Sequence, residues 1–170
     1  MKTRLIALCL VLGSWGANAQ HDHAAHNADK KTELTKAMFK DSKLGTAYEH
    51  YLHVKDALVA SKGNEAKEGA GELQKALKDV NGSAAALEVA TKIAATSDLE
   101  AQRNLFSTLS NEMATLVKGG KLSDGILYLE YCPMANNNNG AYWLSNEKEI
   151  KNPYFGDRML KCGMVKETIQ

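Results

Sequence analysis

Apolar residues recur at intervals of three or four positions from about residue 33 to residue 118, which is the spacing of amphipathic helices. The pattern predicts four helices, near residues 33–61, 65–80, 84–96 and 98–118. Ser83 is expected to cap the third helix, and Ser97 with Glu100 fits a capping box at the start of the fourth. Short polar connections that contain glycine or asparagine separate the helices. These features predict an antiparallel four-helix bundle.

The hydrophobic pattern changes after the fourth predicted helix. Residues 126–131 are apolar and rich in aromatic side chains, which is typical of a strand, and residues 141–144 form a second candidate strand. Between them, residues 136–140 favour a turn because asparagine and glycine tolerate positive φ. The predicted fold is therefore mainly α, with a small irregular or β cap at about residues 120–170. The cap and the helices together are expected to form one domain, residues 33–170.

The start of the chain has the composition of a secretory signal peptide. A short basic region precedes an apolar run, residues 5–12, that is too short to span a bilayer, and small residues match a cleavage site after Ala19. We therefore expect residues 1–19 to be removed and the protein to be periplasmic or secreted. Residues 20–32 are polar and lack periodicity, which predicts a flexible leader.

Composition and motifs argue against several classes of protein. The formal net charge is +1 at pH 7, so nothing favours nucleic acid as a partner. No segment beyond the expected signal peptide is apolar enough to cross a membrane. The chain also lacks a phosphate-binding glycine loop, a nucleophile elbow and a zinc-binding helix with paired histidines. We therefore expect a binding protein and not an enzyme.

Sulfur-containing residues gather in two short stretches of the cap. One holds Cys132 and Met134, and the other holds Met159, Cys162 and Met164. The proline after the first cysteine favours extended backbone, in which residues two apart point the same way, while residues three apart share a face of a helical turn. Two thiolates and one or two thioethers are therefore expected to converge. Cysteine and methionine sulfur suit Cu(I), and cysteine also suits zinc, so the pattern predicts a metal site.

The same two cysteines have a second interpretation. In an oxidising compartment Cys132 and Cys162 can form a structural disulfide, and closing a loop of about thirty residues contributes roughly 3–4 kcal/mol. Methionines usually fill cores, but three of the six methionines lie within three residues of these cysteines, and this favours the metal site. The alternative function is a non-metal interaction module of the cell envelope whose cap is held by the disulfide.

Histidines provide further candidate ligands. His21, His23 and His26 lie close together in the leader, and imidazole binds Cu(II), zinc and nickel. His50 and His53 are three residues apart in the first predicted helix, so they share one helix face. The predicted set of metal ligands therefore extends to these five residues, although such a pair on an amphipathic helix is more often unliganded.

One segment of the cap carries a family resemblance. Residues 131–165, YCPMANNNNGAYWLSNEKEIKNPYFGDRMLKCGMV, resemble the end of an uncharacterised family of exported bacterial domains. Domains of that family occur alone or fused to periplasmic adaptor subunits of heavy-metal efflux pumps, and the helical region resembles them more loosely. The matching residues of the segment are Cys132, Pro133, Met134, Ala135, Gly140, Trp143, Leu144, Asn152, Pro153, Tyr154, Gly156, Met159, Leu160, Cys162 and Gly163. The resemblance implies a role in handling copper or a related metal, with a periplasmic efflux component as a partner. It implies no reaction.

Overall fold

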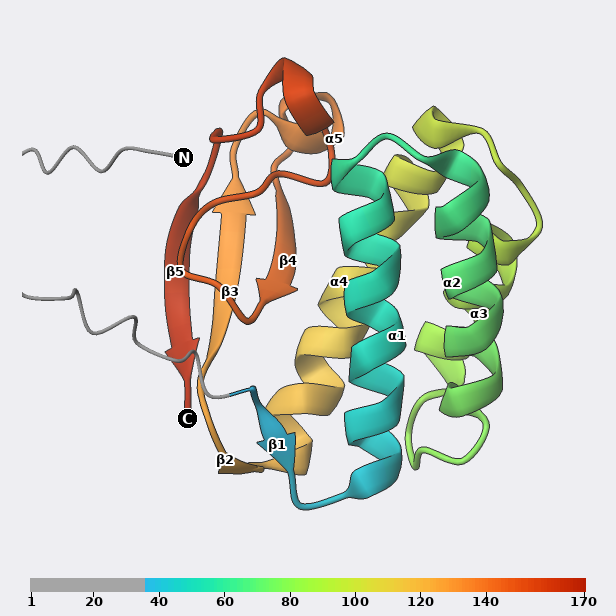
Figure 1. The fold of residues 1–170 in the computed structure, drawn as a ribbon, viewed down its shortest axis with the longest axis vertical. Coiled ribbons are helices and arrows are strands. Elements are labelled where there is room, and N and C mark those ends of the chain that lie inside the picture. Colours follow the sequence, from blue (N-terminus) through green and yellow to red (C-terminus); the bar gives the residue numbers. More distant parts are fainter. Residues whose placement is uncertain (1–35) are drawn as a thin grey trace, which may run out of the picture. The chain divides into compact units, whose positions relative to one another are not determined.

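The structure is a computed structural model that describes residues 36–170 (Figure 1). The expected signal peptide, the leader and the three leader histidines lie outside the described residues. Within the described part, four long helices precede a three-stranded antiparallel sheet, and a two-stranded sheet joins the two ends of the helical region. The prediction of a mainly helical protein with β structure near the C-terminus is therefore confirmed.

The four helices follow one another closely along the chain. They are Ser42–Val59 (α1), Gly63–Leu77 (α2), Ala84–Ala94 (α3) and Leu99–Gly120 (α4). Each helix packs against the next one, and α4 also packs against α1 (Figure 1). The apolar periodicity predicts both ends of each of the last three helices to within a few residues. Over residues 36–170, every helix is too short or too polar to cross a membrane.

The first helix begins later than predicted. Met38–Phe39 forms a short strand, β1, which pairs with β2 (Leu122–Asp124), and α1 starts only after Asp41. The carboxylate of Asp41 accepts a hydrogen bond from the backbone N–H of Lys43 at 2.9 Å and so caps the helix at this point. Met38 is 57% exposed and does not lie on a buried helix face. The helix boundary is therefore set by the capping carboxylate, and the apolar spacing before it belongs to a strand.

Two of the predicted caps also differ from the structure. Ser83 precedes α3, but its hydroxyl donates to the carbonyl oxygen of Leu77, the last residue of α2, at 2.6 Å and to that of Val80 at 2.8 Å. At the start of α4, Asp98 takes the cap position, and its carboxylate accepts from the backbone N–H of Ala101 at 2.7 Å. The capping box of Ser97 with Glu100 is therefore wrong, because a carboxylate one residue later satisfies the free N–H group.

The main sheet contains three antiparallel strands. They are Leu127–Cys132 (β3), Ala141–Ser145 (β4) and Met164–Ile169 (β5), in the order β4-β3-β5. The first two confirm the predicted strands, whereas the sequence pattern does not reveal β5. Between β3 and β4 lies a short helical turn, α5 (Ala135–Asn138), and a 3₁₀ turn, η1 (Gly156–Arg158), precedes β5.

A row of aromatic rings connects the helices with the sheet. Tyr48 and Tyr51 of α1 stack on each other, and Tyr51 stacks on Phe106 of α4, with ring centres 6.0 and 5.2 Å apart. Tyr154 then contacts both Phe106 and Trp143 of β4, with ring centres 5.9 Å apart in each pair. All five rings are buried. They form the part of the core that holds the cap against the helices.

The hydroxyl of Tyr51 adds a polar connection within this core. It shares a hydrogen bond with Ser110 of α4 at 2.8 Å and accepts the backbone N–H of Leu144 in β4 at 3.0 Å. All three groups are buried, so losing the hydroxyl would leave polar atoms without partners. One side chain of α1 therefore joins α4 and the edge of the sheet.

Two glycines of α2 give a matched test of this packing. A Cβ at Gly71 would meet no atom within 4 Å, whereas a Cβ at Gly63 would lie 2.2 Å from the carbonyl oxygen of Ser97. Gly71→Ala is expected to raise the free energy of unfolding by about 0.5–1 kcal/mol, because alanine favours the helix. Gly63→Ala is expected to lower it. Urea denaturation followed by circular dichroism measures both, and effects of the same sign would contradict the packing described for Gly63.

Candidate functional site

Cys132 and Cys162 lie in contact at one end of the main sheet. Cys132 ends β3 and is fully buried, whereas Cys162 is partly exposed in the turn before β5. Their Sγ atoms are 2.9 Å apart, and both residues are free thiols. The structure therefore brings together the two cysteines that the sequence analysis paired.

Asn152 holds the turn that carries Cys162. This asparagine is fully buried, and its side-chain N–H donates to the carbonyl oxygen of Cys162 at 2.7 Å. Its side-chain oxygen accepts the backbone N–H of Tyr154 at 2.8 Å, and its own backbone N–H donates to the carbonyl oxygen of Leu160 at 2.8 Å. The turn closes where the N–H of Cys162 donates to the carbonyl oxygen of Met159 at 3.0 Å. One buried side chain thus fixes the position of the exposed thiol beside the buried one.

The contact between the thiols also affects their protonation. Hydrogen bonding with Cys132, together with partial burial, raises the pKa of Cys162 to about 11. At neutral pH Cys162 therefore retains its proton. A metal ion binds the thiolate form, so binding at this pair would release protons.

Met134 and Met159 lie in a different place from the thiols. Both line a groove of about 690 Å³ beside the start of α4, and the lining does not include either cysteine. Met134 is 47% exposed, and Met159 is partly exposed. Of the predicted thiolate–thioether set, the two thiols meet at the end of the sheet and the two thioethers line one groove.

Met164 lies apart from both groups. It begins β5, is 47% exposed, and pairs across the sheet with Tyr131. Successive residues of a strand point to opposite faces, so Tyr131 and Met164 share the face opposite to that of Cys132. Lys166 lies on this same face, with its ammonium group 5.4 Å from the centre of the Tyr131 ring. Met164 is therefore poorly placed to join the thiol pair.

The histidines of α1 face its neighbour α2. His53 lies against Gly69, and His50 lies on the same side of α1, near Glu72. Over residues 36–170, His, Cys, Asp and Glu side chains form no group of three or more that could hold a metal ion. Methionine is not among those four residue types. Within this part of the chain, His50 with His53 and the thiol pair therefore each lack a third ligand of these four types.

Glu130 is a polar residue of this region that the sequence analysis missed. It lies in β3 two residues before Cys132, is fully buried, and pairs across the sheet with Trp143. Among the described residues, neither its carboxyl oxygens nor the indole nitrogen of Trp143 has a hydrogen-bond partner. Burial raises the pKa of Glu130 to about 8, and the charge of Lys55 partly opposes this rise. The signal in the sequence is one acidic residue inside an otherwise apolar strand.

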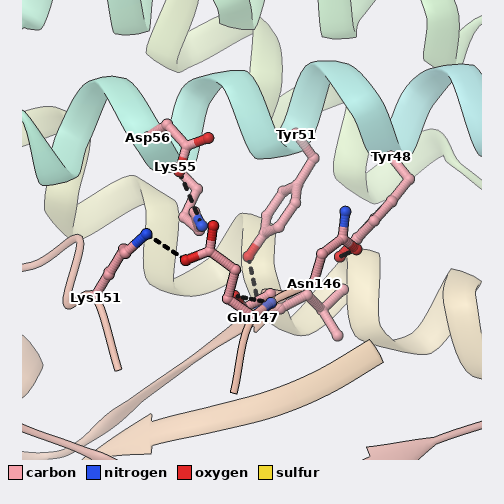
Figure 2. A network of polar contacts seen from close by, with 9 residues as sticks. Tyr48, Tyr51, Lys55, Asp56, Asn146, Glu147 and Lys151 are labelled. Carbon is pink, nitrogen blue, oxygen red and sulfur yellow. Dashed lines mark hydrogen bonds and ion pairs between the residues drawn. The ribbon is translucent and has the colours of Figure 1, made fainter. Parts of the chain in front are cut away.

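The charges of Lys55, Glu147 and Lys151 act on this buried carboxyl group. Figure 2 shows the polar side chains of α1 and of the loop after β4, which face one another across the edge of the core. The pairs are Lys55 with Asp56 at 2.9 Å, Tyr48 with Asn146 at 3.2 Å, and Lys151 with Glu147. Lys55 is itself only 4% exposed. The interface between α1 and the cap therefore contains two ion pairs, Lys55 with Asp56 and Lys151 with Glu147.

Comparison with known proteins finds one family relation. Residues 47–125 match the model of a family described as "Protein of unknown function (DUF3347)". A search of curated proteins and a search of solved structures gave no significant match. The matched residues begin within α1 and end after β2, so Cys132, Cys162 and Asn152 lie outside them. The helical region is thus similar to an uncharacterised domain family.

Proposed function

We propose that the protein binds a soft metal ion at Cys132 and Cys162, with Cu(I) as the favoured ion and zinc as the alternative. The observation that carries the proposal is the 2.9 Å contact between two free thiols from separate segments of the cap. Thiolates bind soft cations strongly, and thioethers suit Cu(I). Each thiol has a methionine on its own segment, Met134 beside the first and Met159 beside the second.

The exposure of the methionines supports this proposal. Met113 fills the core, as most methionines do. In the described part of the chain, the large hydrophobic side chains that are exposed are Met38, Met134 and Met164, all of them methionines. One of these three, Met134, lies two residues from Cys132 and lines the groove beside the start of α4. A thioether kept in contact with water is available to a ligand in a way that a core side chain is not.

The distance between the thiols sets a geometric requirement. Metal–thiolate bonds of about 2.3 Å place two sulfur atoms roughly 4 Å apart, so the pair would have to open by about 1 Å. Cys132 is fixed in a strand, whereas Cys162 lies in a partly exposed turn. We therefore expect the turn of residues 159–162 to make this movement.

A second candidate function rests on the same contact. A disulfide needs its sulfur atoms about 2.05 Å apart. The observed separation of 2.9 Å lies about midway between this length and the separation expected in a metal-bound pair. In this case Cys132 and Cys162 would form a structural bridge. The protein would then be an interaction module of the cell envelope that binds no metal.

Location and partner belong to the same proposal. The expected signal peptide and the family resemblance support export and action in the periplasm. There the protein would take up or transfer a thiophilic ion and would pass it to, or receive it from, a component of a metal-efflux system. No catalytic step is part of the proposal.

Metal loading of the reduced protein tests the proposal. The wild type and the Cys132→Ser/Cys162→Ser variant are loaded with Cu(I) under anaerobic conditions, and a Cu(I) chelator then competes for the ion. We expect the double variant to bind Cu(I) more weakly by more than ~100-fold, because loss of the main ligands should exceed the 10- to 100-fold cost of losing an outer-shell partner.

Two controls make the result interpretable. Circular dichroism shows whether the double variant keeps its fold, and a thiol assay of the untreated protein shows whether the cysteines are oxidised. Equal retention of copper by the folded variant and the wild type would refute the metal site. A disulfide that resists mild reductants, together with an absence of copper uptake after full reduction, would instead support the structural bridge.

A further inference from the structure

The groove beside the thiol pair has its own set of sulfur ligands. Met134 and Met159 both line it, and each lies on the same short segment as one of the cysteines. Met134 follows Cys132 by two residues, and the turn from Met159 to Cys162 is closed by a backbone hydrogen bond of 3.0 Å. Each of the two segments thus carries one thiol and one thioether.

The segment between β3 and β4 forms part of the wall of this groove. Asn136, Asn137 and Asn138 all have positive φ, at 52°, 54° and 64°, and all three line the groove. Asparagine tolerates this conformation better than most residues, but three in succession still carry a conformational cost. The left-handed turn carries the chain away from Met134, whose side chain stays 47% exposed.

The charged residues of the groove favour a soft ion over a hard cation. The lining contains two carboxylates, Asp98 and Glu100, and two guanidinium groups, those of Arg103 and Arg158, so its formal charges cancel. Arg103 is also engaged with backbone carbonyl oxygens at 2.9 Å. A hard cation needs several free oxygen ligands, whereas two neutral thioethers suit a soft monovalent ion.

We infer that the groove is a separate outer site, in which Met134 and Met159 bind a soft monovalent ion before it moves to the thiol pair. The transfer part of this inference rests on the proposed function, whereas the outer site stands without it. During transfer, the ion leaves two thioethers and binds the sulfur atoms of Cys132 and Cys162. The two thiol protons pass to water or buffer, and the ion keeps its charge of +1, so no oxidant or reductant is needed.

The outer site is tested in the Cys132→Ser/Cys162→Ser variant, in which the thiols cannot bind. Its methionine methyl groups are labelled with ¹³C, and Ag(I) is added in chloride-free buffer as a redox-inert probe. We expect the methyl signals of Met134 and Met159 to shift together and to saturate with one ion per chain. The signals of the exposed Met38 and Met164 should not follow them.

Two results of this titration would overturn the outer site. Equal shifts of every exposed methionine would show non-specific binding of Ag(I), and no shift at Met134 and Met159 would show that the groove does not bind it. The outcome does not depend on metal binding by the thiols. Failure of the proposed function would therefore be seen in the chelator competition, and failure of the outer site would be seen here.

The transfer step is tested in the chain that retains both thiols. Met134→Leu/Met159→Leu keeps apolar bulk and removes the thioethers, and Met38→Leu/Met164→Leu is the matched control. Stopped-flow mixing with Ag(I) should show that the first variant binds the ion at least ~10-fold more slowly than the control. Association rates among variants of one binding interface vary over about this range. Its equilibrium affinity should equal that of the control. A loss of affinity without a slower rate would mean that the thioethers and thiols bind the ion in a single site.

Discussion

Glu130→Gln is expected to gain stability relative to the wild type as the pH rises, by about 3–4 kcal/mol between pH 5 and pH 9. The carboxyl group has an ordinary pKa of 4.5 in the unfolded chain and a pKa of about 8 when buried in the fold. Between these values the folded state binds more protons than the unfolded state. The stability of the wild type therefore falls as the pH rises from about 4.5 to about 8, and a neutral glutamine removes this loss.

Urea denaturation of the reduced proteins at several pH values measures this difference. Burying an unpaired amide costs the variant the same amount at every pH, so only the change of the difference with pH is diagnostic. Glu68→Gln is the control, because Glu68 is exposed on α2 and is not among the charges that act on Glu130. Its difference from the wild type should stay nearly constant over the same range. A constant difference for Glu130→Gln as well would show that this carboxyl group does not titrate as a buried group.

Asn152→Ala is expected to lower the free energy of unfolding by about 2–5 kcal/mol, because it removes two buried hydrogen bonds. It leaves the carbonyl oxygen of Cys162 and the backbone N–H of Tyr154 without partners. The turn that carries Cys162 should then lose its fixed position beside Cys132. Chemical denaturation measures the first effect, and Cu(I) affinity or the rate of thiol oxidation in the folded variant measures the second.

Two further variants separate these effects. Asn139→Ala removes an exposed amide that bonds only within its own turn, at 3.0 Å, and should cost less than ~1 kcal/mol. Asn152→Asp retains an acceptor for the backbone N–H of Tyr154 but loses the donor to Cys162, so it should change the chemistry of the thiols as Asn152→Ala does. Unchanged thiol chemistry in a folded Asn152→Ala variant would mean that the turn is held by other contacts.

The parts of the fold that follow from local periodicity were predictable. Helices α2, α3 and α4 each bury one apolar stripe, and β3 and β4 are short apolar runs on either side of a turn-forming segment. The strand β5 was not predictable in this way, because most of its residues are exposed at the edge of the sheet. Its position depends on pairing with β3, which is a long-range contact.

The candidate site was predictable only in part, for a similar reason. The clustering of sulfur near Cys132 and Cys162 indicated that these two residues would meet. The placement of Met134 and Met159 in a separate groove depends on the left-handed turn of three asparagines and on the path of the loop after β4. The role of Asn152 depends on contacts across that loop. None of these features has a repeating pattern in the sequence.

The bridging hydroxyl of Tyr51 has a consequence for how the molecule opens. It joins α1, α4 and the backbone of Leu144 in β4 at one buried point, with hydrogen bonds of 2.8 and 3.0 Å. The Leu144 amide can then exchange its hydrogen with solvent only when the helices and the sheet separate, which makes its exchange a measure of global unfolding. Helices and cap should therefore unfold as one cooperative unit, although the family match covers only residues 47–125.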